Sequence, residues 1–197
     1  MENKLIFLCI IALLLASCAS KSPAVYFQEG KQPALPSKAK VKTVLSVSQE
    51  NVNEKLSAVL FAVPNEKYRL ELSGTFGLSA ASLLWNDGNW KIVFPQEERY
   101  MEGTGDCVFV PIYGGVDIHK FSLLFLGQRV DAIDCGGQNV FKTEYVENSV
   151  LLSSGTDLLK LEIKNIDSKP QWGSGVWNVN VPDKFVRVTL PQPGFGM

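Results

Sequence analysis

The amino-acid sequence predicts an α+β domain in which a curved antiparallel sheet is wrapped around one helix. Two observations lead to this fold class. Most of the chain after residue 40 consists of stretches in which apolar and polar residues alternate, as in half-buried strands. One stretch, residues 117–127, instead has its apolar residues at helical spacing. Long strands on both sides of a single helix are typical of a sheet that packs against it.

Five strands are expected before the helix, joined as an up-and-down meander. Residues 68–73 alternate most regularly and place Tyr68, Leu70 and Leu72 on the inward face. The sequence Asn86-Asp87-Gly88-Asn89 is a strong turn signal and predicts a hairpin. The five expected strands span residues 42–48, 56–63, 68–73, 78–85 and 90–94.

The helix has recognisable start and stop signals. Asp117 can accept hydrogen bonds from the first-turn N–H groups, and Gly127 occupies the stop position. Phe121, Leu124 and Phe125 lie on its apolar face, which predicts a heavily buried helix. The strand pattern then returns over residues 140–146, 150–153, 158–166, 177–181 and 185–190.

The N-terminal stretch has the pattern of an export signal. Lys4 precedes an almost unbroken apolar run over residues 5–15, which suits a signal core of roughly 7–15 residues and is too short to span a bilayer. The sequence Leu15-Ala16-Ser17-Cys18 resembles the lipobox of bacterial lipoproteins, which implies cleavage before Cys18 and lipid on its sulfur. The alternative is an ordinary signal peptide that happens to contain a cysteine. Ala19 in place of aspartate favours an outer-membrane location facing the periplasm.

The chain is expected to fall into four segments. After a signal peptide over residues 1–17, residues 18–40 contain Pro23, Pro33 and Pro36 and no helical pattern, which predicts a lipid-anchored flexible tether. The folded domain spans residues 41–191, and residues 192–197 form a tail.

Composition narrows the possible functions. The net charge of −1 and the interspersed charges exclude a nucleic-acid interface of the usual basic kind. Cys107 and Cys135 form an even pair in an oxidising compartment, so a disulfide and two free buried thiols both remain open.

Residues that could carry catalysis are sparse. The single histidine, His119, lies in the expected helix and is interpreted as a surface or packing residue. Asp131 and Asp134 lie together after the helix, where two acids are usually solvated. No metal-ligand spacing and no phosphate-binding loop are present in the sequence. We therefore expect neither an enzyme nor a bound metal or cofactor.

The loop Gly74-Thr75-Phe76-Gly77-Leu78 carries two apolar side chains where turns are normally polar. Either Phe76 folds back over the edge of the core, or it is a hydrophobic finger that enters lipid or an apolar ligand.

Several short motifs between residues 66 and 127 carry a family resemblance. They are Tyr68-Arg69-Leu70-Glu71-Leu72, Phe76-Gly77, Leu83-Leu84-Trp85, Trp90-Lys91-Ile92-Val93 and the helix that ends in Leu126-Gly127. Together they resemble the core of LolB-like proteins, the outer-membrane receptors that accept lipoproteins from a periplasmic LolA-like carrier. The proline-broken residues 21–40 and the two cysteines depart from that family.

The resemblance implies an incomplete β-barrel around a central helix, enclosing an apolar cavity for the acyl chains of lipoproteins or lipids. It also implies that Phe76 and Leu78 form a membrane-insertion loop. The inward positions give the candidate cavity residues Leu60, Leu70, Leu72, Leu83, Trp85, Ile92, Phe121, Leu124 and Phe125.

The expected function is therefore to bind acyl chains and to assist lipoprotein insertion into the outer membrane. A tethered binding or interaction module for another lipid or for an envelope secretion complex is the main alternative. A hydrolase that uses one of the two cysteines is the third.

Overall fold

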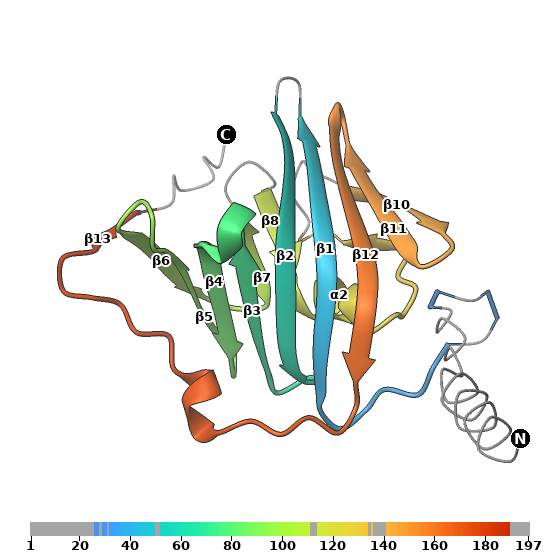
Figure 1. Ribbon diagram of the computed structural model, residues 1–197, viewed down its shortest axis with the longest axis horizontal. Coiled ribbons are helices and arrows are strands. Elements are labelled where there is room, and N and C mark those ends of the chain that lie inside the picture. The colour runs from blue at the N-terminus through green and yellow to red at the C-terminus, as the bar shows by residue number, and fades with distance from the viewer. Residues whose placement is uncertain are drawn as a thin grey trace, which may run out of the picture.

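The dominant feature of the molecule is one eleven-stranded sheet (Figure 1). The computed structural model describes residues 26–27, 29–30, 32–49, 52–110, 114–133, 135 and 141–189. The sheet order is β13-β6-β5-β4-β3-β2-β1-β12-β11-β10-β9, and its neighbouring strands are antiparallel except β13 and β6. The strands before the helix are β1 (Ala39–Gln49), β2 (Val52–Val63), β3 (Lys67–Ser73), β4 (Ser79–Asn86), β5 (Asn89–Phe94) and β6 (Arg99–Thr104). Those after it are β9 (Ala132–Ile133), β10 (Phe141–Val146), β11 (Ser149–Ser154), β12 (Asp157–Asp167) and β13 (Val186–Arg187).

Tight turns join the strands of the meander. Between β4 and β5 the turn residues Asp87 and Gly88 both have positive φ, at 49° and 73°. Two left-handed residues match the right-handed twist of the flanking strands, which is why the predicted turn sequence gives a hairpin. The expected five-strand meander is present and continues into β6.

A short helix and a hairpin cover one face of the sheet, here called the inner face. The helix α2 (Ile118–Phe125) begins where the Asp117 side chain accepts hydrogen bonds from the N–H groups of His119 and Lys120. The hairpin is formed by β7 (Cys107–Val110) and β8 (Gly114–Asp117), which form a separate two-stranded sheet. In Figure 1 these elements lie behind the large sheet. Leu124 and Phe125 are fully buried and join α2 to the core.

The segment after β12 lies on the opposite, outer face. This outer strap, residues 168–189, runs past the ends of the central strands and pairs with β6 through its own strand β13 (Figure 1). Trp172 packs edge-on against Phe61, a β2 residue whose neighbours Leu60 and Ala62 face inward. Arg69 of β3 also holds the strap through hydrogen bonds to backbone carbonyl oxygens.

The predicted fold class is wrong. The described residues contain one α-helix of eight residues beside an eleven-stranded sheet, so the structure is mainly β. The sheet is open, because its edge strands β13 and β9 pair only with β6 and β10. It therefore forms no barrel around a central helix. Alternation of residues predicts which face a strand buries, but it does not predict how strongly a sheet curves.

Two expected elements also differ from the structure. The strand expected at residues 177–181 is absent, and Ser174–Trp177 instead form the 3₁₀ turn η2. The strand expected at residues 185–190 is reduced to β13, which pairs in parallel with β6. Both lie on the outer strap, which contacts the sheet through side chains such as Trp172 and through the two paired residues of β13.

Part of the expected tether packs on the domain. Phe27 is 5% exposed, and the Tyr26 N–H donates to Asn148 Oδ1 at 3.0 Å. The Gln128 side chain donates to the carbonyl oxygen of Pro33 at 2.6 Å. The predicted signal peptide (residues 1–17), Cys18, Asp134 and the tail (residues 192–197) lie outside the described residues.

Candidate functional site

An apolar cavity lies between the inner face of the sheet and its cover. Its volume is about 160 Å³, and every residue that lines it is apolar. The strands contribute Leu45, Val47, Leu56, Leu70, Leu72, Ala81, Leu83, Ile92, Phe94, Leu152 and Leu159, while the cover contributes Val108, Val116, Ile118, Phe121, Ile133 and Phe141. Such a cavity can take an apolar group and offers no polar group to hold a headgroup.

The structure separates the nine predicted cavity residues into two sets. Leu70, Leu72, Leu83, Ile92 and Phe121 line the cavity. The others are buried but pack elsewhere in the core: Leu60, Trp85, Leu124 and Phe125. Alternation identifies the inward face of a strand. It does not predict at which positions along that face the side chains fill the core and at which they border a cavity.

Sequence analysis missed several lining residues. Leu45 and Val47 lie on β1 and have the same alternation that identified Leu70 and Leu72, so that signal was available. Val108 and Val116 come from the β7–β8 hairpin, which the sequence did not predict because its strands have only four residues each.

The cavity opens toward η1 (Thr75–Gly77), the turn between β3 and β4. Leu72 and Ala81 are paired beside this turn and are half-buried, as is Leu56. A Cβ atom added to Gly74 would lie 3.9 Å from Leu56 Cδ2, which places the turn directly above that side chain. On the side of the cover, lining residues such as Val108 and Ile133 are 1% exposed.

The size of the cavity limits what fits without movement. An engineered cavity of roughly 150 Å³ with a similar lining binds benzene. The observed volume of about 160 Å³ therefore accepts a group of that size. A complete acyl chain requires the half-buried rim residues or the inner cover to move apart.

The η1 loop displays its apolar side chains to solvent. Phe76 is 97% exposed and Leu78 is 60% exposed, so Phe76 does not fold over the edge of the core. The backbone explains this orientation. Phe76 and Gly77 have φ of 62° and 73°, and the Gly74 N–H closes the loop on the Leu78 carbonyl oxygen at 2.9 Å. An L-residue in the left-handed region carries a conformational cost of about 1 kcal/mol.

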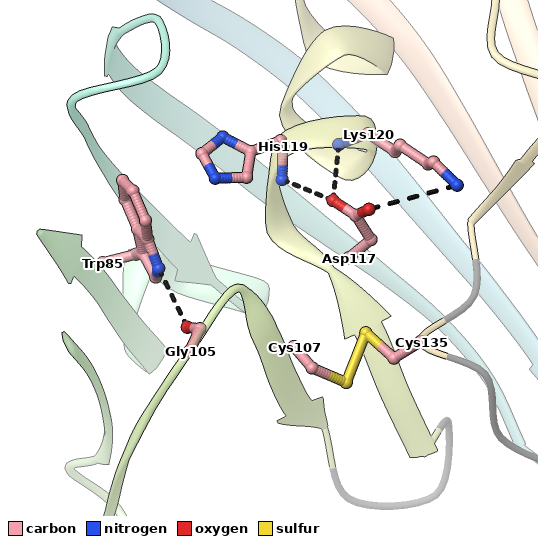
Figure 2. Close-up of a disulfide and its surroundings, with 7 residues drawn as sticks. All are labelled: Trp85, Gly105, Cys107, Asp117, His119, Lys120 and Cys135. Atoms are coloured by element: carbon pink, nitrogen blue, oxygen red, sulfur yellow. Dashed lines mark hydrogen bonds and ion pairs between the residues drawn. A yellow bond between two sulfur atoms is a disulfide. The ribbon is translucent and has the colours of Figure 1, made fainter. Parts of the chain in front are cut away.

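A chain of polar contacts beside α2 runs from the buried Tyr68 through the half-buried His119 to the exposed Asp106. The Tyr68 hydroxyl accepts from the Asn65 N–H at 2.8 Å and lies 3.3 Å from His119 Nδ1, while His119 Nε2 lies 3.4 Å from Asp106 Oδ1. The His119 ring also packs edge-on against Trp85, whose Nε1–H donates to Gly105 O at 3.1 Å (Figure 2). Burial raises the pKa of Tyr68 above its ordinary value. These contacts give His119 a packing role in the structure.

A disulfide joins the start of β7 to the segment just after β9. Cys107 at the start of β7 is bonded to Cys135, with the Cα atoms 5.7 Å apart (Figure 2). Gly115 lies against it, and an added Cβ there would be 2.8 Å from Cys107 Sγ. Because a disulfide sulfur is not a thiolate nucleophile, the cysteine-hydrolase alternative has no free thiol at these two positions.

Two further features are absent from the described part of the chain. Within it, no group of three or more His, Cys, Asp or Glu side chains is placed to hold a metal ion. Nor does that part contain a helix long and apolar enough to cross a membrane.

Comparison with known proteins finds matches among solved structures. No protein-family model and no curated protein matches the chain. The solved structure of the LolA superfamily protein NE2245 from Nitrosomonas europaea aligns with a TM-score of 0.47 and 4% identity, over 74% of this chain and 92% of that one. At this TM-score and identity the alignment carries no argument about this chain. The aligned protein is described as a LolA superfamily member and not as a LolB-like receptor.

Proposed function

We propose that this chain is a membrane-anchored protein that binds acyl chains in the inner cavity and assists lipoprotein insertion into the outer membrane. One observation carries the proposal: an entirely apolar cavity opens beside a loop whose Phe76 is 97% exposed. The cavity suits an acyl chain, and the loop suits the membrane into which the chain is released.

The proposed mechanism is passive transfer. A chain end enters at the rim beside Leu72 and Ala81, and the neighbouring side chains separate as more of it is buried. Each buried methylene contributes about 0.8 kcal/mol, which can offset the opening of the rim. A step that is downhill by about 1.4 kcal/mol biases the partition tenfold, so no nucleotide, metal or catalytic step is required.

Location and partners are part of the same proposal. The sequence at residues 15–18 supports a lipid anchor on Cys18, and Ala19 supports the outer membrane with the domain facing the periplasm. The cargo is the acyl part of a lipoprotein or lipid, delivered by a periplasmic LolA-like carrier.

Filling the cavity tests the binding step. In Ala81→Phe the new ring occupies the cavity beside Leu72, whereas in Ser82→Phe the ring lies on the outer face of the same strand. We expect Ala81→Phe to abolish stoichiometric binding of a triacylated lipoprotein, measured by native mass spectrometry on Cys18→Ala protein, and Ser82→Phe to retain it. Equal binding by both variants contradicts the use of this cavity.

A charge in the loop tests the release step. Phe76→Glu removes the exposed ring, and Asn65→Glu places the same charge in another exposed turn that also has positive φ. We expect delivery of bound cargo to liposomes to fall at least tenfold in Phe76→Glu alone, with binding retained. Absence of binding to any lipid would instead favour an interaction module of an envelope complex.

A further inference from the structure

A second hollow lies between the sheet and the outer strap. It is a wide groove of about 920 Å³, with a floor formed by β4, β5 and β6 and a wall formed by residues 177–180 of the strap. It shares no lining residue with the apolar cavity. Its chemistry is also different, because it mixes polar side chains with an aromatic ring.

Four side-chain amides lie along this groove. Asn86 and Asn89 flank the β4–β5 turn, and Asn178 and Asn180 lie opposite them on the strap. Each amide offers both a donor and an acceptor, so the set complements a ligand that carries both kinds of group. Asn178 and Asn180 are exposed, which leaves their amides accessible.

One tryptophan adds apolar surface to the groove. Trp177 is half-buried, with Lys67 Nζ 4.8 Å from the centre of its ring and Trp172 packed edge-on against it. The Trp90 side chain lies on the inner face instead, because Trp90 is paired with Trp85 and belongs with it to the buried core.

The charges in the groove nearly balance. Glu102 lies 3.3 Å from Lys91 Nζ and 3.5 Å from Arg187 Nη1, so one carboxylate is shared by two cations. This arrangement does not provide the excess positive charge that a polyanion requires. The polar lining likewise does not suit an acyl chain.

The strap wall is fixed in place before any ligand binds. Arg69 Nη1 donates to the carbonyl oxygens of Val176 and Asn178 at 2.6 and 2.9 Å. Further along, the Val186 and Val188 N–H groups donate to β6 carbonyl oxygens at 2.9 and 2.8 Å. A wall held at both ends presents its side chains in a defined geometry, which lowers the entropic cost of binding.

We propose that this groove binds an oligosaccharide of N-acetylated amino sugars. Side-chain amides pair with the N–H and C=O of acetamido groups and with ring hydroxyls, while the Trp177 indole ring packs against the apolar C–H face of a pyranose. The nearly neutral charge and the open, elongated shape suit an uncharged chain of several sugar units.

Indole resonances in an NMR titration test the proposal directly. The chain has four tryptophans, so its four indole N–H signals can be assigned by single Trp→Phe replacements. The full chain, held in a detergent without a sugar headgroup, is titrated with chitotetraose, and with cellotetraose as the ligand that lacks acetamido groups. We expect the Trp177 signal to shift with chitotetraose alone and the signal of the core residue Trp90 to stay in place. Trp85 is the internal control, because its Nε1–H is bonded to Gly105 O outside the groove.

Alanine variants of asparagines inside and outside the groove test whether the sugar binds in the groove. Asn178→Ala combined with Asn180→Ala removes two exposed amides and should weaken chitotetraose binding about tenfold. Asn165→Ala, an exposed amide on β12, is the matched control and should have no effect. Ala81→Phe should also leave this binding unchanged, which keeps the result independent of the cavity. A soluble fragment of cell-wall glycan that shifts the same signal would identify the envelope polymer as the source.

Three results would overturn the proposal: no shift at millimolar chitotetraose, equal shifts with cellotetraose, or binding that survives the double asparagine variant.

Discussion

The inner and outer faces of the sheet are covered in different ways. The inner cover, formed by α2 and the β7–β8 hairpin, meets the sheet through apolar side chains such as Leu124 and Phe125. The outer strap meets it through edge-on rings and through the two hydrogen bonds from Arg69. Apolar burial is non-directional, so the inner cover can leave a cavity and still be held. Hydrogen bonds are directional, so the strap is held at particular points with an open groove beside it.

The largest expected effect is a loss of stability on truncating a leucine in the inner layer, and it should differ between a fully packed position and a position at the cavity. Leu124 is fully buried and does not line the cavity, so Leu124→Ala should lower the free energy of unfolding by about 3 kcal/mol. Leu72 is half-buried at the cavity rim, and Leu72→Ala should cost only about 1 kcal/mol. Urea denaturation measures both values. Similar costs at the two positions would mean that the cavity is filled in solution.

A smaller effect concerns the polar chain beneath α2. Burial raises the pKa of Tyr68, so the folded protein holds this proton more tightly than the unfolded chain does. Its stabilising contribution is therefore complete below pH about 10 and is lost as the pH rises through the folded pKa. Tyr68→Phe should cost about 1 kcal/mol at neutral pH, because it removes the hydroxyl between Asn65 and His119.

The control for this prediction is the pH profile itself. Stability of the parent protein, measured by urea denaturation from neutral pH to about pH 11, should fall more steeply above pH 10 than that of Tyr68→Phe. Parallel profiles would show that Tyr68 titrates with an unshifted pKa.

The smallest global effect is expected on the outer face. Arg69→Lys keeps the positive charge but loses the fork that reaches both Val176 and Asn178. The free energy of global unfolding should change by less than about 0.5 kcal/mol, while hydrogen exchange of the strap amides should accelerate about tenfold. If the strap amides exchange no faster than before, the strap is held by its rings and not by Arg69.

The two faces also differ in how far the sequence predicts them. Alternation in residues 68–73 predicts the inward set Tyr68, Leu70 and Leu72, and Asp117 predicts the start of α2. Pairing between β1 and β12 is long-range and leaves no local signal, so the open sheet could not be distinguished from an incomplete barrel. The groove was not predicted because the strap residues that form its wall have no periodic pattern of apolar residues. Its amides also come together only when β13 pairs with β6. Long-range pairing therefore accounts for most of what the sequence does not predict.

The position of β1 has a consequence for how the chain folds. Strands β1 to β6 can form by successive hairpins, and so can β10 to β12, but the two groups meet only where β1 pairs with β12. Val41 and Ile166 are neighbours in that pairing although most of the chain separates them. Closing so long a loop is slow, because the chain loses conformational entropy before the stabilising contacts between the two strands form. Until the last third of the chain is available, β1 exposes an unpaired edge, and a chaperone that shields this edge during folding would protect the protein from aggregation.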